Sequence, residues 1–172
     1  MKAFEEIAKG EGLIGFYETM KNPAMISMVG PTPITASGDY TIGAMYSHMM
    51  LLFSGLFAMI VSILHVVGHT RKEEDLGLTE LVRSFQIGRQ ANSLAVMLQT
   101  IFINVILATL ISAVMLSFGT DTITIEGALL FGVSVGMAGI IGGAIALLMA
   151  QIMPTSSGAT GTSLGIVGLL YI

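Results

Sequence analysis

The 172-residue sequence has no cysteine and few charged residues, and each absence excludes a class of protein. Without cysteine there are no disulfides and no thiolate metal sites. Asp, Glu, Lys and Arg make up 10% of the residues, whereas about 25% is usual in soluble domains. With 53% hydrophobic residues and a mean hydropathy of +0.85, the composition predicts an integral membrane protein.

Two further absences bear on ligands. The net charge is −4 and no basic patch is present to neutralise phosphates, so we expect no nucleic-acid binding. The phosphate-binding pattern G-x-x-x-x-G-K-[ST] is also missing, because residues 10–16 (GEGLIGF) have glycines but no lysine. We therefore expect that the chain binds no cofactor and is not an enzyme by itself.

Long apolar runs dominate the rest of the sequence. Residues 43–67, 94–118 and 127–153 lack charged side chains, and each exceeds the roughly 20 apolar residues that cross a bilayer. A fourth run, 161–172, is shorter. Because backbone groups in lipid must pair within their own segment, the runs are expected to be helices. The predicted fold is an all-α, polytopic membrane bundle with three full transmembrane helices and a truncated fourth.

The distribution of Lys and Arg predicts the orientation of these spans. The loop 68–92 contains four of the seven basic residues, whereas residues 24–42 and 119–126 contain none. Basic residues favour the cytoplasmic side. We therefore expect a plasma-membrane protein with 68–92 in the cytoplasm and the other two segments outside. Because successive spans cross the membrane in opposite directions, the predicted turn 154–160 is expected on the cytoplasmic side, although it carries no charge.

Residues 1–42 are predicted to be an external segment of short amphipathic helices, ahead of a membrane region at 43–172. Asn22 is a good helix cap, and Pro23 suits the first helical position. Gly30 supplies a helix stop. A helix is therefore expected between these residues.

The loop stretch 69–89, HTRKEEDLGLTELVRSFQIGR, gathers four acids and four bases. Thr70 followed by Glu73 is a capping-box pattern, and Thr79 offers a cap for a second, amphipathic helix. Balanced charge favours docking on a soluble protein, because complementary charges fix register and orientation. The alternative is a solvated loop that carries only the topology signal.

The same stretch resembles the first cytoplasmic loop of export-type ABC transporter permeases, in the branch with polyketide-antibiotic and tetronasin exporters. That family shows His-Thr-Arg-x-Glu-Glu-x-x-Gly-Arg-x-Glu-Leu-Leu-Arg-Ser/Ala-x-Pro-Val-Gly-Arg after a span. Besides His69, the matching residues, which the resemblance assigns to the interface with an ATPase subunit, are Thr70, Arg71, Glu73, Glu74, Gly77, Glu80, Leu81, Arg83, Ser84, Gly88 and Arg89. The sequence departs from the family at Leu78, Val82, Gln86 and Ile87. Residues 22–31 also resemble the family's external segment.

The resemblance implies that the chain is a fragment of the membrane subunit of an ATP-driven exporter. Its loop would be a coupling helix seated in a separate cytosolic ATPase, two copies of which use ATP and magnesium. The substrate would be amphiphilic, such as an antibiotic, a drug or a lipid. The alternative is a non-transporting membrane scaffold or sensor whose loop recruits a regulatory partner.

Small and polar residues inside the runs predict where helices meet. A close-packing face in the third run consists of Gly132, Gly136, Gly139 and Gly143. A stripe in the second run consists of Thr100, Asn104, Ala108 and Ser112. Polar groups at this depth face protein or water rather than lipid. The stripe is predicted to form hydrogen bonds between helices or, with Gln99, to line a substrate path.

Three histidines remain. His65 and His69 are four residues apart, but only Glu73 offers a third ligand, so we predict no metal site. His48 is expected at the outer interface beside Tyr46, with its ring reaching the headgroups.

Overall fold

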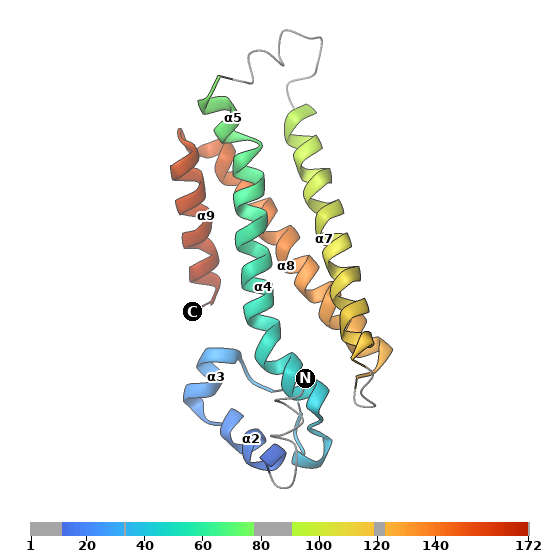
Figure 1. Ribbon diagram of the computed structural model, residues 1–172. Coiled ribbons are helices and arrows are strands. Elements are labelled where there is room, and N and C mark those ends of the chain that lie inside the picture. Colours follow the sequence, from blue (N-terminus) through green and yellow to red (C-terminus); the bar gives the residue numbers. More distant parts are fainter. Residues whose placement is uncertain (1–11, 33, 78–90, 119–122, 172) are drawn as a thin grey trace. The chain divides into compact units, whose positions relative to one another are not determined.

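The computed structural model describes residues 12–32, 34–77, 91–118 and 123–171 (Figure 1). Within these ranges the regular elements are all helices, which confirms the predicted all-α fold. In chain order they are α2 (Gly12–Met20), α3 (Pro23–Val29), the 3-10 helix η1 (Ser37–Asp39), α4 (Ile42–Gly68), α5 (Arg71–Asp75), α7 (Ala91–Ser117), α8 (Ile125–Ile152) and α9 (Ser156–Tyr171).

Three helices among the described residues are long and apolar enough to cross a membrane: α4, which leads into α5, then α7 and α8. They contain 27, 27 and 28 residues. At about 1.5 Å per residue each is about 40 Å long, which exceeds a hydrocarbon core of about 30 Å. Their ends lie within three residues of those predicted from the apolar runs.

The fourth apolar segment begins earlier than predicted. α9 starts at Ser156, five residues ahead of the predicted 161. The cause is Thr155, whose Oγ1 accepts a hydrogen bond from the Gly158 N–H at 3.1 Å and so caps the helix. The Ser/Thr cluster is therefore the first turn of a helix, and the predicted turn 154–160 shrinks to residues 153–155.

Contacts divide the chain into two compact units. Unit 1 consists of residues 1–54 and 109–132, and unit 2 of residues 55–108 and 133–172. Each of the three long helices contributes one part to each unit. Unit 1 also contains α2, α3 and η1, and unit 2 also contains α5 and α9.

The caps that the sequence predicts in unit 1 are present. The Asn22 side chain accepts a hydrogen bond of 3.0 Å from the Ala24 N–H, and Pro23 is the first residue of α3. Gly30 ends this helix with a φ of 85°, which residues with a Cβ rarely adopt. Residues 1–11, part of the predicted amphipathic segment, lie outside the described residues.

Aromatic residues form the core of unit 1. Tyr17, Tyr40 and Met45 are each 1% exposed or less and form one cluster. The Tyr17 hydroxyl donates to the Ile34 carbonyl at 3.0 Å, and the Tyr17 and Tyr40 ring centroids are 5.3 Å apart. Burial raises the pKa of the Tyr40 hydroxyl. The cluster therefore joins α2, the segment between α3 and α4, and the beginning of α4.

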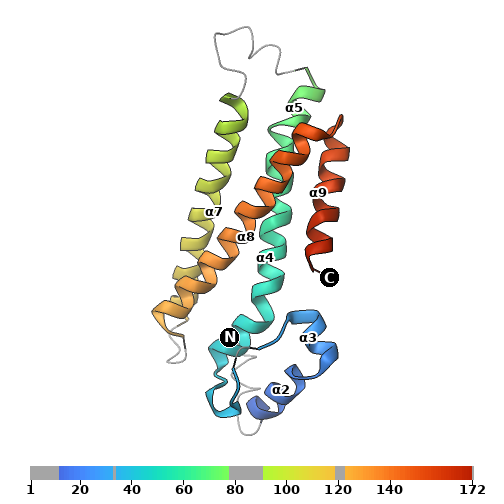
Figure 2. The same ribbon diagram turned by 180° about the vertical axis from the view of Figure 1, so that it is seen from behind.

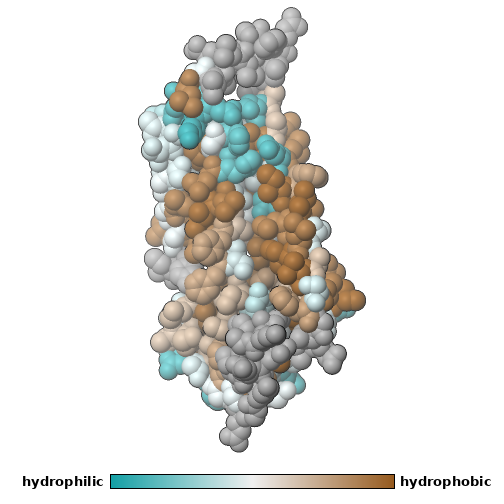
Figure 3. Space-filling view, in the orientation of Figure 1, coloured by the Kyte–Doolittle hydropathy of each residue, from teal (hydrophilic) through white to brown (hydrophobic). Residues whose placement is uncertain are grey.

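The core of unit 2 joins α4, α7, α8 and α9. Its buried residues are Ile63, Val66, Val67, Val96, Ala146, Ala159 and Val167. In both views α9 runs beside the second part of α4 (Figures 1 and 2). Hydrophobic side chains cover much of the surface of this unit, and hydrophilic ones gather at the end that carries α5 (Figure 3). Phe102, for example, is 66% exposed, as suits a face that meets lipid or another helix.

Candidate functional site

The charged loop starts at a tight junction between α4 and α5. The Thr70 hydroxyl donates to the Val66 carbonyl of α4 at 2.6 Å, and the residue is 7% exposed. Thr70 therefore makes no side-chain cap on α5, and the predicted capping box is wrong. The hydroxyl is already bonded one turn back, as serine and threonine hydroxyls in helices often are.

His69 and Glu73 form a pair on the exposed side of this junction. His69 Nδ1 lies 3.2 Å from Glu73 Oε1, and the His65 and His69 ring centroids are 4.8 Å apart. The Asn92 side-chain amide donates to the His69 carbonyl at 3.2 Å. The start of α7 is therefore tied to the end of α4.

Arg71 is the best-connected side chain of α5. Its Nη1 donates to Glu74 Oε2 at 2.8 Å, and its Nε lies 3.5 Å from Asp75 Oδ1. Its Nη2 donates to the carbonyl of Pro154, in the turn between α8 and α9. One guanidinium therefore joins two acids of its own helix to a segment 83 residues away.

Asp75 makes the second contact with that turn. Its Oδ2 accepts a hydrogen bond of 2.7 Å from the backbone N–H of Ser156, the first residue of α9. Hydrogen bonds from Ser156, first of all the one from its backbone, lower the pKa of the Asp75 carboxyl. No sequence pattern predicts this pair. The residues Pro154-Thr155-Ser156 are typical of a helix start. The sequence around them does not indicate that the Ser156 N–H bonds to an acid 81 residues away.

These contacts place the α8–α9 turn at the same end of unit 2 as the charged loop. That is the arrangement that alternation of the spans predicts, and here it rests on direct bonds from Arg71 and Asp75.

The residues that the resemblance assigns to an ATPase interface differ in how far they are exposed. Thr70 is buried, and Arg71 is half-buried by its own partners. Glu73 and Glu74 lie at the surface, and Gly77 follows α5 with a φ of 73°. The other members lie outside the described residues, as does the predicted second helix after Thr79: Glu80, Leu81, Arg83, Ser84, Gly88 and Arg89.

A second feature of unit 2 is a glycine seam between α7 and α8. A Cβ on Gly136 would lie 2.9 Å from the Asn104 carbonyl oxygen and 3.0 Å from the Ala108 Cβ. A Cβ on Gly143 would lie 2.7 Å from the Thr100 Cγ2. The predicted glycine face and the predicted α7 stripe therefore face each other. Gly132, at the end of unit 1, is also buried.

Asn104 lies at the centre of the seam and is 2% exposed. Its amide donates to Ser62 Oγ on α4 at 3.0 Å and to the Thr100 carbonyl at 2.9 Å. Its Oδ1 occupies the space that a Cβ on Gly139 would fill, at 1.8 Å. Asn104 thus joins three helices, as in the predicted role of a hydrogen bond between helices. Gln99 is exposed and does not share this face.

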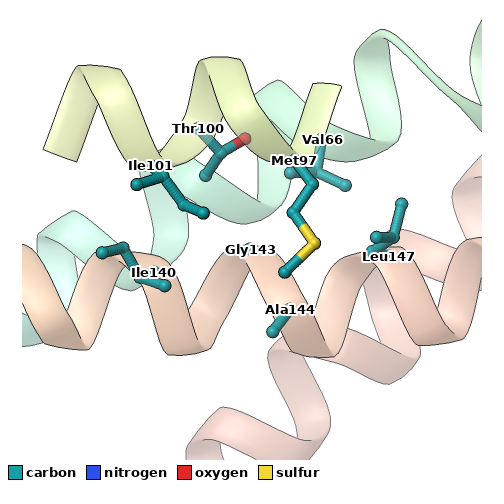
Figure 4. Close-up of a pocket in the computed structure, with 8 residues that line it drawn as sticks. All are labelled: Val66, Met97, Thr100, Ile101, Ile140, Gly143, Ala144 and Leu147. Atoms are coloured by element: carbon teal, nitrogen blue, oxygen red, sulfur yellow. The ribbon is translucent and has the colours of Figure 1, made fainter. Parts of the chain in front are cut away.

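Nearer the loop the seam contains a small gap of about 10 Å³ among the described residues. Its lining residues are Val66, Met97, Thr100, Ile101, Ile140, Gly143, Ala144 and Leu147. In Figure 4 the Met97 side chain extends from α7 toward α8 and ends beside Gly143 and Ala144. A void of this size holds about one water molecule, so this part of the seam is packed rather than hollow.

In unit 1, His48 is bonded to protein groups rather than reaching for headgroups as predicted. Its Nε2 is 2.8 Å from the Gly30 carbonyl oxygen, and its Nδ1 is 3.2 Å from the Tyr40 hydroxyl. A carbonyl only accepts, so Nε2 carries a proton and donates to Gly30. In the neutral ring, Nδ1 then accepts from Tyr40. Tyr46 instead packs against Phe131, with ring centroids 6.0 Å apart.

Comparison with known proteins adds a relative to this all-α membrane bundle. No family model matches the chain, and no solved structure does. The chain is 27% identical over 152 residues to a multidrug efflux system permease protein of Mycobacterium tuberculosis. The match covers 88% of this chain and 26% of that protein. The chain is therefore similar to a transporter over most of its own length and spans about a quarter of the relative's.

Proposed function

We propose that the chain is part of the membrane permease of an ATP-driven ABC exporter that moves an amphiphilic compound such as a drug, an antibiotic or a lipid. The observation that carries the proposal is the 27% identity to a multidrug efflux permease over 88% of the chain. The three membrane-length helices and the resemblance of loop 69–89 to an exporter coupling loop support it.

ATP hydrolysis belongs to a separate subunit in this proposal, as the resemblance of loop 69–89 to the coupling loop of export-type ABC permeases implies. Loop 68–92 faces the cytoplasm and docks on that ATPase, two copies of which use ATP and magnesium. The exposed acids Glu73 and Glu74 on α5 suit contact with basic groups of the partner. Residues 1–42 form the external segment in this proposal.

The seam around Asn104 is a structural element in this mechanism rather than the substrate path. The support for this part of the proposal is that the Asn104 amide bonds to α4 and its Oδ1 fills the space beside Gly139. Small residues let α7 and α8 approach closely, and the buried hydrogen bond keeps α4 in register with them. The spans of unit 2 therefore form one packed bundle around this residue.

Charge reversal in the full-length protein, expressed with its ATPase, tests the proposal. Glu74→Lys combined with Arg83→Glu should reduce both ATPase co-purification and efflux of a fluorescent amphiphile. Glu18→Lys is the matched control, because Glu18 is exposed in unit 1 and lies 3.8 Å from Lys21. Unchanged efflux in the double variant would rule out the docking role of the loop.

The alternative is a membrane scaffold or sensor whose loop recruits a regulatory protein. The balanced charges of loop 69–89 fit that function as well, since they suit any soluble protein partner. Vesicles containing the full-length protein separate the two. A scaffold accumulates no amphiphile on addition of ATP and the ATPase, whereas an exporter does.

A further inference from the structure

Two oppositely charged residues of α5 contact the two sides of the α8–α9 turn. Arg71 donates to the Pro154 carbonyl, just beyond the C-terminus of α8. Asp75 accepts from the Ser156 N–H, at the N-terminus of α9. Each side chain lies at the helix end of opposite partial charge. Cations are favourable at the partly negative C-terminus of a helix, and anions at the partly positive N-terminus.

α5 is itself fixed to α4. The Thr70 hydroxyl donates to the Val66 carbonyl at 2.6 Å, and Thr70 also accepts the first backbone bond of α5, from Glu74 N at 3.2 Å. Arg71 Nε and Asp75 Oδ1 lie 3.5 Å apart, so the two opposite charges attract each other on α5. The end of α4, the short helix and the turn are thus connected in sequence by hydrogen bonds.

We propose that Arg71 and Asp75 are positioning residues that make α9 follow α5, so that movement of the loop reaches the α8–α9 turn as well as α4. This inference rests on the proposed function, in which the ATPase moves the loop. Without the two contacts, α5 would still be joined to α4 through Thr70 but would lose these bonds to the α8–α9 turn.

Ser156→Pro tests the inference by removing the hydrogen bonds from Ser156 to Asp75, the one from its backbone N–H and the one from its hydroxyl. Proline lacks the N–H that Asp75 accepts, and it is well tolerated at the first position of a helix. Ser156→Ala is the comparison variant, because it keeps the backbone bond to Asp75 and loses only the bond from the hydroxyl. Asp75→Ala removes the acceptor and provides a second variant should Ser156→Pro fail to fold.

The measurement is transported amphiphile per ATP hydrolysed, in vesicles with the full-length permease and its ATPase. We expect Ser156→Pro to keep ATPase co-purification and ATP hydrolysis. Transport per ATP should fall about fivefold or more in this variant and in Asp75→Ala, the lower end of typical coupling between sites, and it should fall less in Ser156→Ala. A spin-label pair at Lys72 and Ser157, which line one groove, should show a broader distance distribution in Ser156→Pro.

The outcomes separate the inference from the proposed function. A wild-type protein without ATP-dependent transport contradicts the proposed function, and the inference falls with it. A wild-type exporter whose Ser156→Pro or Asp75→Ala variant transports normally, although the label distances have broadened, overturns the inference alone. Normal distances in both variants overturn it as well, because the two bonds would then not hold α9 to α5.

Discussion

Asn104 on α7 donates a 3.0 Å hydrogen bond to Ser62 on α4, and both side chains are at most 5% exposed. The energetic weight of this pair is measurable in a double-mutant cycle with Asn104→Ala and Ser62→Ala in the full-length protein. Hydrogen bonds between membrane helices contribute about 0.6 kcal/mol on average, so we expect a coupling of that order in resistance to SDS unfolding. If the loss of stability in the double variant equals the sum of the losses in the two single variants, the bond contributes nothing.

Gly139→Ala should destabilise unit 2, because the new Cβ would lie 1.8 Å from Asn104 Oδ1 and force that buried amide to move. Overpacking of this kind typically costs about 1–3 kcal/mol. The readout is the temperature at which the detergent-solubilised protein aggregates. Gly165→Ala is the control, since its Cβ would have no atom within 4 Å, and it should be neutral or slightly stabilising. Equal aggregation temperatures for the two variants would contradict the close packing of Gly139 against Asn104.

Tyr40→Phe should loosen unit 1, because it removes the hydroxyl that donates to His48 Nδ1 while retaining the buried ring. The expected cost is about 1 kcal/mol, the net value of one hydrogen bond. Limited proteolysis of the purified full-length protein at exposed residues 35–39 should become faster. Thr19→Ala, which removes an exposed hydroxyl in the same unit, serves as control. Identical cleavage rates would argue against the His48–Tyr40 contact.

The Asp75 carboxyl should titrate below its ordinary value of 3.8. Because the pKa is lowered in the fold, the stabilisation from this contact is complete above the ordinary pKa. It is lost as the pH falls through the lower, folded value. Carbon NMR of labelled aspartate follows the titration directly. Ser156→Pro should return the pKa toward 3.8, since the bonds from Ser156 are its main cause. A wild-type pKa at or above 3.8 would contradict the bond.

Much of the bundle was predictable because lipid imposes a simple rule. Twenty or more uncharged residues in sequence have one stable form in a bilayer, so α4, α7 and α8 followed from the apolar runs alone. The seam was also within reach. Small residues repeat at helical spacing on one helix, at Gly136 and Gly143, and polar residues do so on another, at Thr100 and Asn104. Small or polar residues inside a membrane face other helices.

The loop contacts were not predictable in the same way. Thr70 fits a capping box and equally a bond one turn back, and the structure shows the second. The partners of Arg71 and Asp75 are backbone groups of Pro154 and Ser156, and a backbone group has no sequence signature. The start of α9 was misplaced because serine and threonine occur in turns and caps alike, and Thr155 is a cap here.

The most direct test of the account is the side of the membrane on which α5 lies. The 172 residues contain no cysteine, so Lys72→Cys and Ser37→Cys each introduce a unique thiol there, and any cysteine elsewhere in the full-length protein is first replaced by serine. Intact cells expressing the full-length protein are treated with a membrane-impermeant maleimide, and permeabilised cells with the same reagent. We expect Ser37→Cys to react in intact cells and Lys72→Cys only after permeabilisation. Reaction of Lys72→Cys in intact cells would place α5 outside, where no ATPase can reach it, and would contradict the exporter proposal.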